Sequence, residues 1–99
     1  MFMTFDFTYI GTREAIDVVR ELVESYKNRN LDVKEYEDNG DTCIGYEMGH
    51  TIVKVKADGV IRSFDGQFGV LLLENENFRE TDESRKAFGE WAEAGGHKL

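Results

Sequence analysis

The stretch that decides the fold runs from residue 31 to residue 64, LDVKEYEDNGDTCIGYEMGHTIVKVKADGVIRSF. Turn signals interrupt it three times, at Asn39-Gly40, Gly49-His50 and Asp58-Gly59. Between the turns apolar and polar residues alternate, which is typical of half-buried strands, and Asn-Gly and Asp-Gly favour turns that match strand twist. The pattern predicts an antiparallel meander with strands at residues 31–37, 42–48, 51–57 and 60–64.

The most apolar run of the chain follows directly, FGVLLL at residues 68–73, after Asp65-Gly66. Because Asp-Gly is a turn signal and a short continuous apolar run is consistent with a strand covered on both sides, we predict another hairpin and a fifth meander strand here. The polar residues 74–80 then predict an irregular connection.

Flanking this region, residues 3–9 alternate cleanly and predict a first strand. Residues 15–26 place apolar side chains at helical spacing and charged ones opposite, which predicts an amphipathic helix capped by Thr12. Thr81, followed by Asp82 and Glu83, is typical of the start of a second helix, and Gly95-Gly96 is typical of its end.

The predicted order is therefore β-α-β-β-β-β-β-α. Short connections favour an α+β fold, a single two-layer domain over residues 1–99. In it, an antiparallel sheet of five to six strands carries two helices on one face. A chain of 99 residues can support one core without disulfides, and the single Cys43 cannot form an internal bridge.

Charge limits the range of functions. Twenty acidic residues against twelve basic ones give a net charge of -8, which argues against direct nucleic-acid binding because such binding depends on cations that neutralise phosphates. Residues 30–50 carry a balance of -5 and residues 74–99 a balance of -3. Without a long apolar segment or a signal peptide, we expect a cytoplasmic protein with no membrane contact.

The sequence contains no complete motif for metal binding or catalysis. Glu35, Glu37 and Gly40 are spaced as in the start of a calcium-binding loop, but Tyr46 occupies the position where a bidentate Glu is needed. Cys43 and His50 are about 20 Å apart along a strand, too far for an activated thiol. We therefore expect no cofactor, no metal and no enzymatic activity.

In size, acidity and lack of catalytic motifs, the chain resembles the small inhibitors that phages use against host defences. Anti-CRISPR and anti-restriction proteins belong to this group, and some of them mimic nucleic acid. The likeness is one of overall character and covers no alignable segment. It implies a non-enzymatic binding protein that occupies a basic, nucleic-acid-handling site on a partner protein. We expect the chain to be a monomer or a homodimer.

We expect the contact face to combine the acidic hairpin at residues 32–41 with the segment at residues 74–83, because carboxylates along extended strands can replace phosphates in a basic groove. The candidate partner-binding residues are Asp32, Glu35, Glu37, Asp38, Asp41, Glu74, Glu76 and Glu80.

Three alternatives stay open. The acidic residues could serve only to keep the protein in solution and to blunt exposed strand edges. The chain could be a small-ligand-binding or metabolic accessory domain with a pocket between helix and sheet. It could also be a structural subunit that self-assembles through Phe64 and Phe68.

Overall fold

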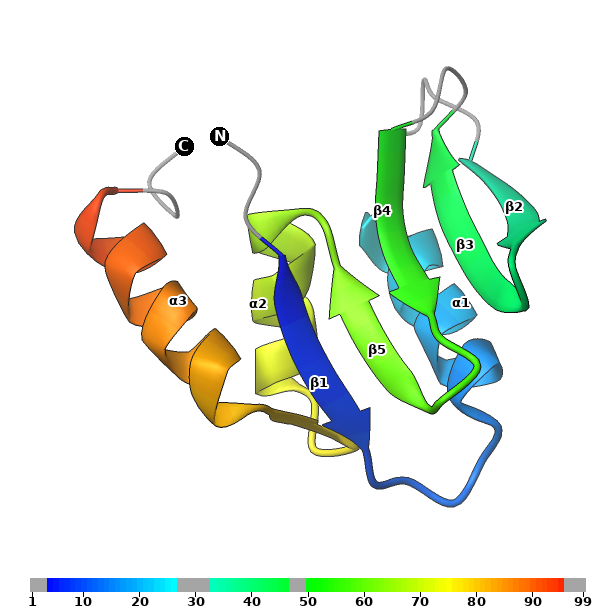
Figure 1. Ribbon diagram of the computed structural model, residues 1–99, viewed down its shortest axis with the longest axis horizontal. Coiled ribbons are helices and arrows are strands. Elements are labelled where there is room, and N and C mark those ends of the chain that lie inside the picture. The colour runs from blue at the N-terminus through cyan, green and yellow to red at the C-terminus, as the bar shows by residue number, and fades with distance from the viewer. Residues whose placement is uncertain (1–3, 27–32, 47–49, 96–99) are drawn as a thin grey trace.

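The sheet has the predicted antiparallel meander at its centre. The computed structural model describes residues 4–26, 33–46 and 50–95, and Figure 1 shows the arrangement of its elements. In chain order these are β1 (Phe5–Tyr9), α1 (Ala15–Tyr26), β2 (Val33–Asp38), β3 (Asp41–Tyr46), β4 (His50–Val55), β5 (Val60–Ser63), α2 (Gly66–Glu74), β6 (Phe78–Glu80) and α3 (Asp82–Glu93). The six strands form one antiparallel sheet in the order β2-β3-β4-β5-β1-β6, which confirms the α+β class.

Two of the predicted turns form as the sequence indicates. Asn39 and Gly40 both have positive φ, 52° and 88°, which is the backbone that a two-residue hairpin with matching twist requires. Gly59 has a φ of 93°, and its N–H donates to the Lys56 carbonyl at 2.9 Å. The third turn, at Gly49-His50, lies partly outside the described residues, and His50 is the first residue of β4.

The predicted strand at residues 68–73 is wrong, because this segment is helix α2. Asp65 caps it, since its carboxylate accepts hydrogen bonds from the N–H groups of Gln67 and Phe68 at 2.9 and 3.1 Å. Asp before Gly suits a helix N-cap as well as a turn, and an apolar run lacks a period that separates strand from buried helix. Phe68 is fully buried, so it cannot mediate self-assembly.

The segment at residues 74–80, expected to be irregular, contains the short strand β6, which pairs with β1 from Phe7↔Glu80 to Tyr9↔Phe78. The chain therefore has a β-α-β-β-β-β-α-β-α order, with three helices in the described residues where two were predicted.

All three helices pack against one face of the sheet. Phe5 and Phe7 of β1 lie on the same face as Ile61 and Ser63, their partners in β5. On this face the Phe5 ring stacks on Phe88 of α3, with centroids 4.0 Å apart. The same core includes Phe68 of α2 and Val19 of α1, both fully buried. Figure 1 shows α1 and α2 behind the sheet, with α1 behind the β3–β4 side.

Two glycines allow close approach between elements of the fold. A Cβ on Gly69 would lie 2.9 Å from the Phe88 ring, so glycine lets α2 approach α3. A Cβ on Gly45 would lie 2.4 Å from the His50 carbonyl oxygen, at the point where the β3–β4 register shifts. Glycine is common at such bulges because the neighbouring backbone comes close.

Replacing Asp65 tests the cap of α2. Asp65→Ala removes the acceptor for two helix N–H groups and should lower the free energy of unfolding by about 1 kcal/mol. Urea denaturation measures this change. Asp65→Asn keeps a capping oxygen and should retain most of the stability; if Asp65→Ala unfolds like the wild type, the cap contributes nothing.

A pair of glycine substitutions tests the contact between α2 and α3. Gly69→Ala should destabilise the protein because the new methyl group meets the Phe88 ring. Gly89→Ala, on the exposed side of α3 with no atom within 4 Å of its Cβ, should stabilise it by about 0.5–1 kcal/mol. Thermal unfolding of both variants gives the comparison, and equal shifts would contradict close packing at Gly69.

Candidate functional site

The structure places the predicted carboxylates in two separate groups. Those of the hairpin lie on β2 and β3, at one edge of the sheet, while Glu74, Glu76 and Glu80 lie at the end of α2, in the following loop and on β6. Since β6 is the opposite edge, about five strand spacings or roughly 24 Å separate the two groups. Asp32 lies outside the described residues. The two segments therefore lie at opposite edges of the sheet.

The hairpin carboxylates contact groups of this same chain. Both oxygens of Glu35 accept hydrogen bonds from Arg20 of α1, at 2.7 and 2.8 Å. Asp38 lies 3.4 Å from Nζ of Lys54, and Asp41 accepts a hydrogen bond from the Ala57 N–H at 2.8 Å. The remaining member, Glu37, accepts a hydrogen bond from the Thr42 hydroxyl at 3.0 Å. These contacts attach the hairpin to α1 and to the rest of the meander.

The pair of Glu35 and Arg20 crosses from the sheet to the helix layer. It also lines a hollow of about 290 Å³, together with the apolar side chains of Val23, Val33 and Ile44. The guanidinium of Arg20 holds the pKa of Glu35 below its usual range, chiefly through the hydrogen bonds. The paired carboxylate therefore favours the folded state while it is ionised.

The carboxylates from the end of α2 onward have fewer partners than those of the hairpin. Glu80 accepts a hydrogen bond from Arg85 at 3.0 Å, but Glu74 and Glu76 are exposed and form no ion pair within the described residues. The same holds for the exposed acidic residues of α3, which are Asp82, Glu83, Glu90 and Glu93. We refer to residues 74–93 as the C-terminal acidic segment; its seven acidic and three basic residues give a charge of -4.

Sequence reasoning missed Glu90 and Glu93 as members of this set. The signal was present, since both fall on the polar side of the amphipathic pattern at residues 82–93, opposite Phe88 and Trp91.

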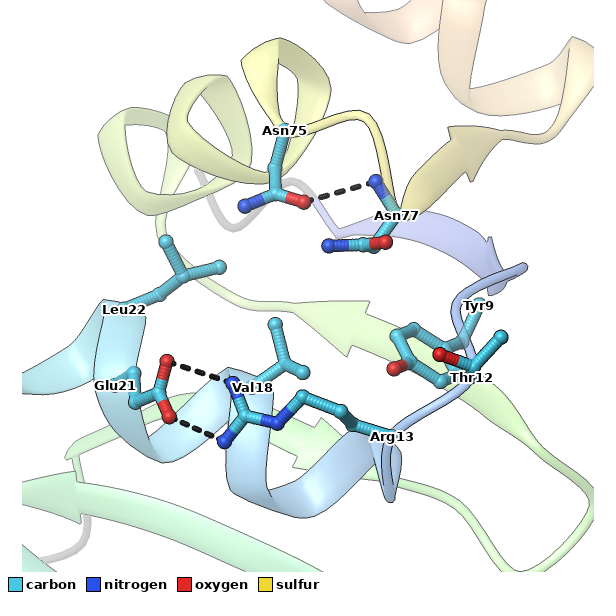
Figure 2. A pocket seen from close by; sticks show the side chains of 8 residues that line it. All are labelled: Tyr9, Thr12, Arg13, Val18, Glu21, Leu22, Asn75 and Asn77. Carbon is cyan, nitrogen blue, oxygen red and sulfur yellow. Dashed lines mark hydrogen bonds and ion pairs between the residues drawn. The ribbon is translucent and has the colours of Figure 1, made fainter.

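A pocket of about 220 Å³ lies where β1 ends (Figure 2). Two regions far apart in the sequence form it: residues 9–22, which run from the end of β1 into α1, and the α2–β6 loop. Its lining residues are Tyr9, Thr12, Arg13, Val18, Glu21, Leu22, Asn75 and Asn77. The Ile10 N–H donates to the Asn77 carbonyl at 2.8 Å, which attaches the α2–β6 loop to the end of β1. The pocket is therefore a product of the tertiary fold.

Helix α1 begins at Ala15, three residues after Thr12, so the predicted N-cap role of Thr12 is wrong. The Thr12 side chain lines the pocket instead. Gly11 allows the connection to pass close to the pocket wall, because a Cβ there would lie 2.4 Å from the Tyr9 hydroxyl and 2.9 Å from Asn77 Oδ1.

Comparison with known proteins adds no relative. No protein-family model matches this chain, and neither does any curated protein or solved structure. Its function is therefore inferred from its own residues.

The structure also bears on a reactive thiol, a metal site and a membrane span. Cys43 is 1% exposed, and burial raises the pKa of its thiol, so the reactive thiolate is disfavoured. Within residues 4–26, 33–46 and 50–95, no three His, Cys, Asp or Glu side chains are arranged to hold a metal ion. Over the same residues, no helix is long and apolar enough to cross a membrane.

A variant at Glu35 tests the link between hairpin and helix. Glu35→Gln should lower the thermal unfolding midpoint at neutral pH, because Arg20 loses one of its two ionised partners and keeps only Asp17. Since folding lowers the pKa of Glu35, its contribution is complete above the ordinary carboxylate range and is lost as the pH falls through the lowered value. The gap between variant and wild type should therefore close in acid. Glu14→Gln, at an exposed position, is the control, and a gap that is independent of pH would contradict this account.

Proposed function

We propose that this chain is a non-enzymatic binding protein that occupies a basic, nucleic-acid-handling site on a partner protein. The observation that carries the proposal is the set of exposed carboxylates of the C-terminal acidic segment that no cation of the chain neutralises within the described residues. Such groups meet a cationic surface without first giving up a partner of their own.

Electrostatics favours this segment over the hairpin. Docking through Glu35 or Asp38 would compete with Arg20 and Lys54, so part of the gain from a new cation would be offset by the loss of an existing one. Docking through Glu74, Glu76 and the exposed acidic residues of α3 displaces no cation of the described residues. Exposed charges of one sign raise association rates and make binding sensitive to salt.

Blocking a binding groove of the partner is a mode of inhibition that a small chain can perform. An inhibitor that blocks a groove needs a stable surface of the right charge and no catalytic group. This is the mode that the likeness to phage anti-defence proteins implies, and it would operate in the cytoplasm, where CRISPR and restriction complexes act. The partner is then a protein whose nucleic-acid site carries lysine and arginine, the residues that neutralise phosphates.

Charge reversal tests the proposal. Glu74→Lys/Glu76→Lys and Glu14→Lys/Glu37→Lys each shift the net charge from -8 to -4, but only the first pair lies in the C-terminal acidic segment. Tagged wild type and both variants would be used to capture proteins from bacterial lysate at low and at high salt. We expect a nucleic-acid-handling protein that the wild type retains at low salt and that the first variant binds about tenfold more weakly.

The second variant separates local docking from net charge. If it retains the partner like the wild type, the carboxylates of residues 74–93 make the contact. Equal loss in both variants would mean that only total charge matters, and loss in the second alone would move the contact to the hairpin side. Unfolding midpoints of all three proteins show whether each variant is folded.

A further inference from the structure

The pocket at the end of β1 presents polar side-chain groups that no described residue engages. Among the described residues, no hydrogen bond engages the hydroxyls of Tyr9 and Thr12 or the side-chain amide of Asn77. Asn75 differs, because its Oδ1 accepts a hydrogen bond from the Asn77 N–H at 2.9 Å, and this leaves its amide NH₂ as a donor. Hydroxyls and amides of this kind both donate and accept.

Charge in the pocket cancels. Its two ionised side chains, Arg13 and Glu21, form a two-pronged ion pair with each other on the rim, where they are 57% and 60% exposed. A ligand carrying a net charge would meet one attractive and one repulsive group there. The pair therefore favours a neutral ligand that takes hydrogen bonds from the guanidinium and gives them to the carboxylate.

The pocket also has apolar walls. Figure 2 shows Val18 and Leu22 of α1 on one side of the space, with the Tyr9 ring and the Asn77 amide on others. The Tyr9 ring is held by Phe78 of β6, with centroids 5.3 Å apart, so the hydroxyl is presented from a packed side chain. Aliphatic groups beside hydrogen-bonding groups match a molecule that has C–H surfaces as well as hydroxyls.

We propose that this pocket binds a neutral polyhydroxylated molecule of about monosaccharide size. Its volume of about 220 Å³ is below the range of about 300–1,000 Å³ usual for drug-sized ligands. Each ligand hydroxyl can donate and accept, which suits the mixed set formed by Tyr9, Thr12, Asn75 and Asn77. The pocket shares the α2–β6 loop with the C-terminal acidic segment, but it uses the amides of Asn75 and Asn77 where the proposed docking uses the carboxylates of Glu74 and Glu76.

Titration of the ¹⁵N-labelled protein of 99 residues tests this inference. The probes are D-glucose, D-galactose and D-mannose, with D-glucosamine and D-glucuronate as charged molecules of similar size. We expect saturable shifts at the Gly11 amide and at the side-chain amides of Asn75 and Asn77, with a dissociation constant for at least one neutral sugar of about 1–10 mM. Both charged sugars should bind more weakly.

Variants locate the binding in the pocket. Tyr9→Phe removes one hydroxyl while keeping the ring against Phe78, and Asn77→Ala removes the free amide; each should weaken binding about fivefold or more. Tyr36→Phe removes a hydroxyl on the opposite face of the sheet, where it bonds to Thr51, and should leave binding unchanged.

Three results would overturn the inference. They are the absence of saturable shifts with all three neutral sugars, tighter binding of either charged sugar, and wild-type affinity in both pocket variants. Partner capture should be the same for Tyr9→Phe as for the wild type, so failure of the pocket and failure of the docking proposal are distinguished.

Discussion

The stacking of Phe5 on Phe88 joins the first strand of the sheet to the last helix of the chain, within the core that all three helices share. Stacked aromatic rings bury a large apolar area, and Gly69 lets α2 come close enough to complete the contact. With α3 fixed over β1, the preceding strand β6 pairs along the edge of β1. That pairing brings Asn75 and Asn77 beside Tyr9 and so forms the pocket.

The same packing sorts the carboxylates. Near the β2 edge they meet Arg20 and Lys54, which the helix layer and the meander supply, and they act there as connections within the fold. At the β6 edge most of the acidic groups face outward without a cation from the described chain. The difference between the two edges arises because the fold brings Arg20 and Lys54 to the carboxylates at the β2 edge.

Much of the fold could be predicted because its signals are local. Asn39-Gly40 and Asp58-Gly59 specify turns through their own backbone preferences, and Thr81 caps α3 with its own hydroxyl, which accepts from Ser84 N–H. Prediction failed at α2, where Asp65-Gly66 and the apolar run suit a hairpin and a helix equally. It failed at β6 because three residues form a strand only when an edge such as β1 offers hydrogen bonds.

The sequence by itself determined the antiparallel meander, the amphipathic helix α1, the start of α3 and the excess of negative charge. Each of these follows from residue spacing or composition over a short stretch. Only the tertiary structure decided that residues 66–74 are helical and that Tyr9 and Asn77 line one pocket. It also decided that Arg20 pairs with Glu35, while no cation of the described residues pairs with Glu74 or Glu76. The physical reason is that these outcomes depend on contacts between residues distant in the chain, which local periodicity does not encode.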